Sequence, residues 1–283
     1  MKSKNYLLSA GLILSAVFTT YYAAISTAQQ AIQTSPPVAA TADNEYQVSG
    51  VLYMQKAGEY RALCYQAFNL AKMSLDADEK NRKKLPKADR KKPRAVVVDI
   101  DETILDNSPQ QARLIKNRLP FNSADWYAWG ELRKAKAIPG AVEFLNYVAS
   151  KNVKVFYVSN REEVQKQATM DNLKSVGFPD VNAEDVLLRD KESTKEPRRQ
   201  LISQKYRIAI LMGDNLNDLS NIFEKKSVAD RFMEVDKTKT EFGSRFIVLP
   251  NAMYGDWESA IYEYQRLTEA QKAEKRANAL ELP

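Results

Sequence analysis

The sequence predicts an α/β protein in which helices cover both faces of a doubly wound, mostly parallel sheet, giving three layers. Short runs of β-branched and other apolar residues alternate with longer stretches of helical periodicity, which is the pattern of consecutive βαβ units. Several of these runs end in polar or acidic residues, as strands do when their carboxyl ends face a binding crevice. The expected strands are 95–98, 153–158, 186–188, 208–212 and 246–249.

The first 28 residues indicate an export signal. Lys2 and Lys4 precede an apolar stretch over 6–18, and the small residues 26–28 suit a cleavage site. We therefore expect the mature protein in the periplasm or cell envelope. The alternative is an uncleaved anchor, because the stretch to Ile25 is about long enough to span a bilayer. No cysteine follows this stretch, so we expect no lipid attachment through an N-terminal cysteine.

Residues 29–44 are rich in Ala, Pro, Ser, Thr and Gln and predict a flexible leader. Residues 45–283 are expected to form one domain. It begins with a long helical pattern over 45–78, which predicts an N-terminal helical extension packed on the core. The basic stretch 80–94 that follows is expected to be a solvated connector, with contact to an anionic surface as the alternative.

The segment 105–138 is polar and aromatic and too long for an ordinary loop, so it predicts a small helical cap inserted over the site. Helices are then expected at 139–151 and 162–176, from about residue 195 and from about residue 216. A last charged helix is expected over 258–279.

Composition excludes several kinds of chemistry. The chain has no histidine, which rules out Ser-His-Asp hydrolysis and imidazole-based zinc sites. Cys64 is the only cysteine, so it forms no intramolecular disulfide, and its apolar neighbours predict a buried small side chain. Catalysis must therefore use carboxylates, lysine, hydroxyl groups or a hard metal ion. The net charge of +6 is compatible with anionic substrates.

Polar residues that could carry chemistry follow three of the expected strands. Asp99 and Asp101 come directly after 95–98, Ser159 and Asn160 follow 153–158, and Asp214 follows 208–212. An isolated Asp-x-Asp often serves only as a turn or helix cap. Because the carboxyl ends of parallel strands share one edge of the sheet, we expect these groups to converge there. Lys195 lies in the segment between the second and third of these strands.

Taken together, these clusters resemble the motifs of the haloacid dehalogenase superfamily. Segments 96–109, 155–161, 213–218 and 249–257 are similar to the bacterial class C non-specific acid phosphatases, a family that includes envelope 5'-nucleotidases. The similarity runs from about Tyr46 to Trp257. It implies an acid phosphatase that hydrolyses phosphate monoesters, with nucleoside monophosphates or nicotinamide mononucleotide as the expected substrates.

The resemblance assigns a role to each acidic residue. Asp99 is expected to be the nucleophile, forming an aspartyl-phosphate, and Asp101 the general acid and base. Mg²⁺ suits one or two carboxylates plus a substrate phosphate. The expected ligands are Asp99, Asp214 and the backbone carbonyl of Asp101, with Asp218 in support. Because a free Asp titrates near 3.9, we expect crowding by other carboxylates to keep Asp101 protonated, and hence an acidic optimum.

Lys195 is expected to offset negative charge beside the nucleophile, with Lys191 as the competing lysine. Ser159 is expected to hold the transferring phosphoryl oxygens, with Asn160 in support. Trp126 and Tyr254 match family positions whose rings flank the leaving group, although aromatic residues in an insert can also serve packing alone.

The expected partner is a small phosphorylated substrate. We expect no nucleic-acid polymer, because no aromatic residues interleave the basic stretch 80–94, and a membrane only if the signal stays uncleaved. The sequence also allows a homodimer. Two alternative functions use the same fold: phosphotransfer to another alcohol, and a non-enzymatic envelope-binding protein.

Overall fold

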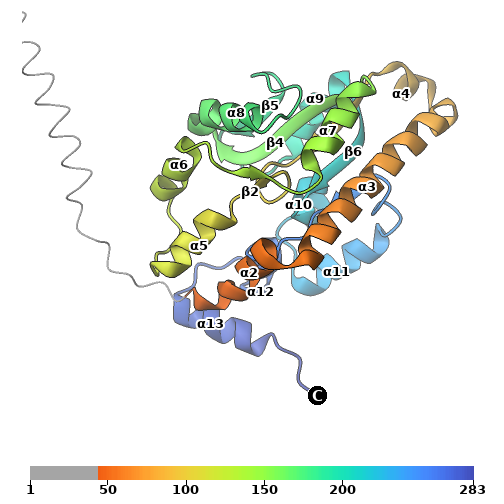
Figure 1. Cartoon of the computed structure of the whole chain (residues 1–283). Helices are drawn as coiled ribbons and strands as arrows, with labels where there is room; N and C mark the ends of the chain where they lie inside the picture. Colours follow the sequence, from red (N-terminus) through yellow and green to blue (C-terminus); the bar gives the residue numbers. More distant parts are fainter. Residues whose placement is uncertain (1–43) are drawn as a thin grey trace, which may run out of the picture. The chain divides into compact units, whose positions relative to one another are not determined.

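Five parallel strands form the central sheet, in the order β5-β4-β1-β6-β7 (Figure 1). The computed structural model describes residues 44–283, so the expected signal and the leader up to residue 43 lie outside the described residues. The strands are β1 (Arg94–Val98), β4 (Lys154–Glu162), β5 (Val186–Arg189), β6 (Arg207–Gly213) and β7 (Phe246–Val248). Each expected strand position is therefore confirmed. Within residues 44–283, no helix has the length and apolar character needed to cross a membrane.

Helices cover both faces of this sheet, which confirms the three-layer, doubly wound prediction. Val96 and Val98 of β1 pack in a core shared with α3 (Gly58–Asn81), α7 (Ala141–Ser150) and α8 (Lys166–Ser175). Ala95 and Val97 point to the other face, where the core includes α9 (Glu196–Lys205) and α10 (Leu216–Leu219). This alternation follows from the two-residue period of a strand. Because both faces are covered, β1 is apolar at every position after Arg94.

The N-terminal extension contains two α-helices where the sequence predicts one long helical pattern. A short 3-10 turn, η1 (Glu45–Gln47), leads into α2 (Val48–Lys56), and α3 then begins at Gly58. Ala57 between them has the extended backbone angles φ −79° and ψ 128°. The break lets α2 pack against the cap while α3 runs along the sheet.

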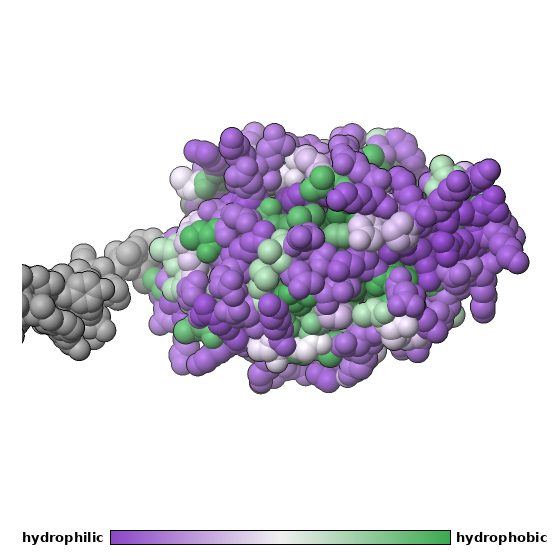
Figure 2. Space-filling view, turned by 90° about the horizontal axis from the view of Figure 1, so that it is seen from above, coloured by the Kyte–Doolittle hydropathy of each residue, from purple (hydrophilic) through white to green (hydrophobic). Residues whose placement is uncertain are grey.

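The basic stretch lies at the amino ends of the strands, away from the carboxyl edge. It forms η2 (Arg82–Lys84) and α4 (Lys87–Lys91), immediately before β1. Most of its lysines are exposed, namely Lys80, Lys83, Lys84, Lys87 and Lys91. The right-hand end of the molecule in Figure 2, where Figure 1 places α4, is accordingly hydrophilic. Contact with an anionic surface stays a prediction.

The inserted cap is mainly helical and is closed by a small ribbon. It comprises β2 (Leu105–Asp106), α5 (Ser108–Lys116), α6 (Ser123–Glu131) and β3 (Lys136–Ala137). Leu105 pairs with Ala137 in an antiparallel ribbon, and the amide of Ile138 donates to the Ile104 carbonyl at 2.9 Å. Both ends of the cap therefore leave the core at one place, a few residues after β1.

Two boundaries differ from the sequence-based expectations. Strand β4 continues through Glu162, so Ser159 and Asn160 lie within the strand and not after it; Glu162 still pairs with Arg189 of β5 beyond a register shift. The 3-10 turn η3 (Glu163–Gln165) follows, and α8 begins only at Lys166. The sheet pairing thus overrides the helical pattern that starts at residue 162.

The helices after β6 and β7 are also more divided than expected. Between β6 and β7 the chain forms α10, η4 (Asn221–Phe223) and α11 (Val228–Lys237). The single helix expected over 258–279 is wrong: α12 (Asp256–Ile261) and α13 (Glu269–Asn278) are separate. Glu263 and Tyr264 between them have φ of 54° and 57°. A left-handed backbone at these two residues ends a right-handed helix.

Candidate active site

The candidate site lies where the connections of the sheet reverse direction. From β1 the chain passes to β4 on one side, and from β6 it passes to β7 on the other. The crevice between the carboxyl ends of such strands is the usual ligand site of open α/β sheets. Asp99 follows β1, with its amide donating to the Met212 carbonyl at 2.9 Å, and Asp214 follows β6.

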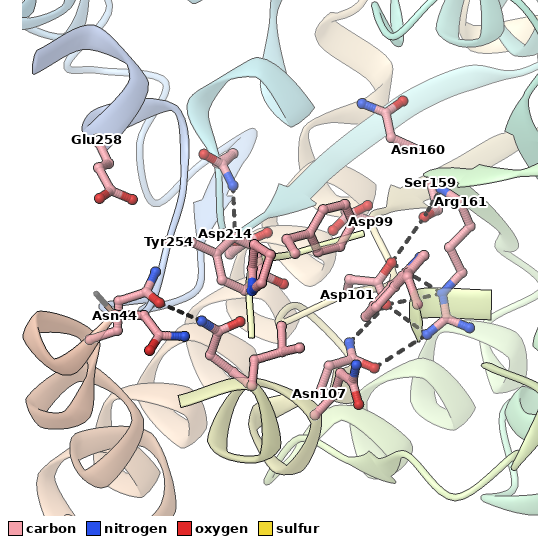
Figure 3. Close-up of a pocket in the computed structure, with 18 of the residues that line it drawn as sticks. Asn44, Asp99, Asp101, Asn107, Ser159, Asn160, Arg161, Asp214, Tyr254 and Glu258 are labelled. Atoms are coloured by element: carbon pink, nitrogen blue, oxygen red, sulfur yellow. Dashed lines mark hydrogen bonds and ion pairs between the residues drawn. The ribbon is translucent and has the colours of Figure 1, made fainter. Parts of the chain in front are cut away.

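A cavity of about 620 Å³ opens at this edge of the sheet (Figure 3). Apart from Lys191, the alternative to Lys195, every side chain that the sequence singled out for catalysis, metal binding or substrate binding lines it. These are Asp99, Asp101, Trp126, Ser159, Asn160, Lys195, Asp214, Asp218 and Tyr254. The expected convergence of separate strand ends is therefore present.

Three carboxylates in this cavity could hold a metal ion. One oxygen each from Asp99, Asp214 and Asp218 lies within 4.8 Å of the others. Hard cations such as Mg²⁺ prefer oxygen ligands of this kind. The side chain of Asp218 is thus a candidate metal ligand, whereas the sequence predicted only a supporting role for it; the Asp101 side chain is not in this group. A metal contact through the Asp101 backbone carbonyl stays a prediction.

The electrostatics of this cluster favour a bound cation. Burial raises the pKa of Asp99 to about 7, and the neighbouring charge of Asp218 adds to the rise although Lys195 opposes it. Burial is also the main reason why the pKa of Asp214 lies well above its ordinary value. The negative charges of Asp218 and Asp99 raise this pKa further. Like charges held close together out of water repel one another. The donor set therefore fits a divalent cation, which would relieve that repulsion.

Gly213 allows Asp218 to approach this cluster. A Cβ atom on Gly213 would lie 2.2 Å from the Asp218 Cβ, which is closer than two non-bonded carbon atoms can approach. Asp218 is also fixed by its own helix, because its Oδ2 accepts from the Asn215 amide at 3.0 Å in a capping box that starts α10. The sequence Gly-Asp-Asn at the end of β6 thus combines a close approach with a helix start.

Lys195 neutralises part of this negative charge. Its buried ammonium group forms ion pairs with Asp99 and with Asp218, the latter at 2.6 Å. Burial alone would lower the pKa of Lys195, but the charges of Asp218 and Asp99 outweigh it and raise the pKa. Lys191, the competing lysine, is exposed. The geometry therefore favours Lys195 over Lys191, which the sequence left as alternatives.

Three polar side chains contact the carboxylates of this acidic cluster. The hydroxyl of Thr103 lies 3.2 Å from Asp99 Oδ2 and 3.3 Å from Asp214 Oδ1, within reach of either as a donor. Asn215 and Asn251 donate to Asp214 Oδ2 at 2.9 and 2.8 Å. Such neighbours fix the orientation of metal ligands.

Asp101 is surrounded by hydrogen-bond donors. Arg161 donates to Asp101 Oδ1 from Nη2 at 2.7 Å and from Nε at 3.0 Å. Asn107 Nδ2 donates to the same oxygen at 2.8 Å, and Ser159 Oγ lies 3.4 Å from Oδ2 (Figure 3). We expected other carboxylates to crowd Asp101, but the groups that contact it directly are hydrogen-bond donors. Its nearest charged neighbour is a buried guanidinium group.

Glu102 links the loop that carries Asp99 to Tyr254, which lines the pocket. It is fully buried and has a φ of 58°. Its carboxylate accepts hydrogen bonds from the Asn107 amide at 2.8 Å and from the Tyr254 hydroxyl. Burial raises the pKa of Glu102 well above its ordinary value, and the negative charges of Asp101 and Asp214 raise it further. Trp129 Nε1 donates to Asn107 Oδ1 at 2.8 Å, so the cap helix α6 joins the same network.

Ser159 and Asn160 are fixed by an arginine of the neighbouring helix. Arg198 of α9 donates to the Ser159 carbonyl at 2.5 Å and to Asn160 Oδ1 at 2.7 Å. Trp126 also lines the cavity, and its ring centroid lies 5.3 Å from the Arg161 guanidinium carbon. The structure thus places Ser159 at the cavity, while its contact with a phosphoryl group stays a prediction.

The sequence patterns predicted no role for four residues that have clear structural roles in the site: Thr103, Glu102, Asn107 and Arg161. The first three lie within eight residues of Asp99, inside a segment that had already been singled out, and Arg161 directly follows Ser159-Asn160. Their proximity to those motifs is the signal that could have identified them.

Comparison with known proteins agrees with this site. The family model "HAD superfamily, subfamily IIIB (Acid phosphatase)" matches residues 10–257. The structure of the class C acid phosphatase from Bacillus anthracis is 41% identical, with a TM-score of 0.78, and covers 84% of this chain and 97% of its own. A second structure of that enzyme, with tungstate bound, gives the same values.

Curated relatives are more distant. A stem 31 kDa glycoprotein of Glycine max is 28% identical over 159 residues, which is 53% of this chain and 53% of the relative. Acid phosphatase 1 of Solanum lycopersicum is 26% identical over 131 residues, 44% of this chain and 51% of the relative. The chain spans about half the length of these curated relatives.

Proposed function

The chain belongs to subfamily IIIB of the HAD superfamily, the acid phosphatases, and from this premise we propose that it is a Mg²⁺-dependent phosphomonoesterase. The proposed reaction passes through an aspartyl-phosphate on Asp99. One observation carries the proposal above all: Lys195 contacts Asp99 in a cavity that also contains Asp101, Asp214 and Asp218. A phosphate ester is repelled by a bare carboxylate; Lys195 places positive charge beside Asp99, and the acidic cluster could hold a cation that adds more.

In the first half-reaction, an oxygen of Asp99 attacks phosphorus and the bond from phosphorus to the leaving oxygen breaks. Asp101 donates a proton to that oxygen, so that an alcohol leaves. Lys195 offsets the negative charge beside Asp99, and Ser159 donates to a phosphoryl oxygen. A bound Mg²⁺, held by Asp99, Asp214 and Asp218, would supply further charge stabilisation for the phosphoryl group.

In the second half-reaction, Asp101 removes a proton from water and the water oxygen attacks phosphorus. The bond between phosphorus and Asp99 breaks, and inorganic phosphate leaves. The protonated Asp101 is then ready for the next leaving group. The contacts from Arg161 and Asn107 hold its carboxylate in one orientation through both steps.

For the substrate, we propose nucleoside monophosphates or nicotinamide mononucleotide. The support is the aromatic character of the cavity beyond the nucleophile, where Trp126 and Tyr254 lie. A flat ring in the leaving group could stack on such side chains. Export to the periplasm or envelope is proposed on the sequence of residues 1–28 alone.

The experiment that tests the function is phosphate release from a panel of monoesters, with Mg²⁺ and after chelation, by wild type and by Asp99→Asn. Asp190→Asn is the matched control, because Asp190 is exposed and outside the cavity. We expect phosphate release that depends on the metal, is lost in Asp99→Asn and is retained in the control. Full activity of Asp99→Asn would rule out the mechanism.

A further inference from the structure

The end of the cavity that is formed by α12 and α13 comes largely from residues beyond the family match. That match ends at residue 257, whereas Glu258 and Tyr262 of the α12 region and Glu269 and Lys272 of α13 line the cavity. Figure 3 places Glu258 and Asn44 on the side away from Ser159 and Arg161. This end is therefore where a leaving group would extend once its phosphate lies at Asp99.

We propose that α13 is the distal wall of the substrate pocket and limits the leaving group to about the size of one nucleoside. This inference rests on the proposed phosphomonoesterase function. The match to the family model ends before α13, so the role of this helix is inferred from its own composition and contacts. The proposal depends on the composition of α13 and on how the helix is attached.

The face of α13 that turns toward the protein is charged. Glu269, Lys272 and Arg276 are partly buried, and their spacing of three and four residues puts them on one side of the helix. No residue of α13 is fully buried. A helix that packs on a hydrophobic core carries an apolar stripe on its inner face. A charged inner face fits a helix that borders a water-accessible, polar cavity.

A single arginine joins α13 to the rest of the pocket wall. The Arg276 guanidinium carbon lies 3.6 Å from the centroid of the Tyr46 ring, a cation–π contact with η1 at the other end of the described chain. Arg276 Nη1 also donates to the Tyr262 hydroxyl at 2.7 Å, and that hydroxyl donates to Glu258 at 2.6 Å. Tyr262 and Glu258 are buried. Arg276 is thus the positioning residue of the wall.

The size of the cavity suits one small ligand. A cavity of about 620 Å³ lies within the usual range for small-molecule sites. In this proposal a leaving group of one nucleoside occupies the space between Asp99 and the α13 residues that line the cavity, and a second linked nucleotide has to displace the helix. Because α13 is attached through polar contacts, such displacement costs binding energy but leaves the catalytic groups in place.

The first test compares hydrolysis of a nucleoside 5'-monophosphate with that of a 5'-phosphorylated dinucleotide. We expect wild type to prefer the mononucleotide in kcat/KM, and Arg276→Ala to reduce this preference by about tenfold, equivalent to about 1.4 kcal/mol. Arg276→Lys keeps the charge near Tyr46 and should retain part of the preference. Lys275→Ala is the matched control, because Lys275 pairs with Glu263 and does not line the cavity.

A second pair of variants narrows the pocket instead of opening it. Lys272→Trp places a large ring in the wall and should raise KM for the mononucleotide more than for p-nitrophenyl phosphate. Glu274→Trp adds the same ring on the exposed side of α13 and should change neither value. This pair keeps the proposal testable if Arg276→Ala fails to fold.

The outcomes separate the two proposals. Phosphate release with an unchanged preference for the mononucleotide in Arg276→Ala, or equal effects of Lys272→Trp on both esters, overturns the role of α13 alone. Equal hydrolysis of both nucleotides by wild type also overturns it. Absence of phosphate release by wild type from every ester overturns the proposed function and, with it, this inference.

Discussion

Arg161 binds the Asp101 carboxylate through two of its nitrogens, Nη2 at 2.7 Å and Nε at 3.0 Å. The arginine side chain is only 1% exposed, whereas that of Asp101 is 18% exposed and reaches the cavity. The buried partner therefore fixes the orientation of the accessible one. We infer that Arg161 acts on catalysis through Asp101.

Replacement of Arg161 by lysine keeps the charge but removes the two-nitrogen contact. We expect kcat to fall about 10²-fold with little change in KM, because Asp101 loses its orientation toward the leaving oxygen. Steady-state kinetics on a small phosphate ester measures both values. Arg133→Lys, which alters an exposed pair with Asp171, is the control and should be unchanged. An unchanged kcat in Arg161→Lys would contradict the positioning role.

Lys195 and Lys191 provide a direct test of the positive charge beside Asp99, the proposed nucleophile. Lys195→Met removes the ammonium group between Asp99 and Asp218, and kcat should fall by about 10²–10³. Lys191→Met changes an exposed side chain four residues earlier and should have no effect. The assay is phosphate release at saturating Mg²⁺. A larger loss in Lys191→Met would reverse the assignment.

Gly213→Ala tests the close approach of Asp218 to the candidate metal site. The new Cβ would overlap Asp218, so the carboxylate must move, and the Mg²⁺ concentration for half-maximal activity should rise about 10–100-fold. Gly58→Ala is the matched control, since nothing lies within 4 Å of a Cβ there. Metal titration of activity gives the comparison. Equal metal dependence in the two variants would remove Asp218 from the metal site.

Tyr254 combines a ring at the cavity with a hydroxyl that contacts buried Glu102. Tyr254→Ala should raise KM for a nucleoside monophosphate by about tenfold more than for p-nitrophenyl phosphate, if the ring stacks on the base. Tyr254→Phe keeps the ring and should preserve KM for the nucleotide. Equal increases for both esters in Tyr254→Ala would argue against stacking.

We expect the buried Cys64 thiol to lower the free energy of unfolding at alkaline pH. Burial raises the pKa of its thiol to about 11, whereas in an unfolded chain the thiol ionises near 8.5. Between these values the unfolded state releases a proton that the folded state retains, so stability falls as pH rises. From pH 8.5 to 10 the expected loss is about 1–2 kcal/mol.

Urea denaturation at several pH values measures this loss, and Cys64→Ala is the comparison because it lacks the thiol. The variant should be less stable overall, since it leaves space in the core, but its stability should decline less steeply with pH. Parallel declines in the two proteins would show that other groups, such as the buried tyrosines, account for the whole effect.

Local sequence patterns predicted the sheet well because each strand carries its own signal. The run 95–98 is apolar at every position, as expected for a strand covered on both faces, and it is β1 in the structure. The helix boundaries were less predictable. The break at Ala57 follows from where α2 and α3 pack, and the two left-handed residues after α12 have no strong turn signal, since neither Glu263 nor Tyr264 is a glycine or asparagine.

The site residues were predictable where motifs mark strand ends. The prediction was incomplete where contacts join segments that are distant in the sequence. Asp99, Lys195 and Asp214 line one cavity as expected. The partners of Asp101 were not foreseen, because Arg161 lies 60 residues away and its direction depends on how far β4 extends. Placing Asp218 in the acidic cluster likewise required the three-dimensional approach of Gly213 to α10.

The ion pair between Lys195 and Asp99 joins residues 96 positions apart, and the contact from Thr103 to Asp214 spans 111. Contacts of such long range carry a large loop-closure entropy, and proteins rich in them fold slowly. No partly folded state that lacks the pairing of β1 with β6 can assemble this site. Recovery of catalytic activity during refolding should therefore coincide with the final acquisition of tertiary structure, making turnover a kinetic marker of the complete native state.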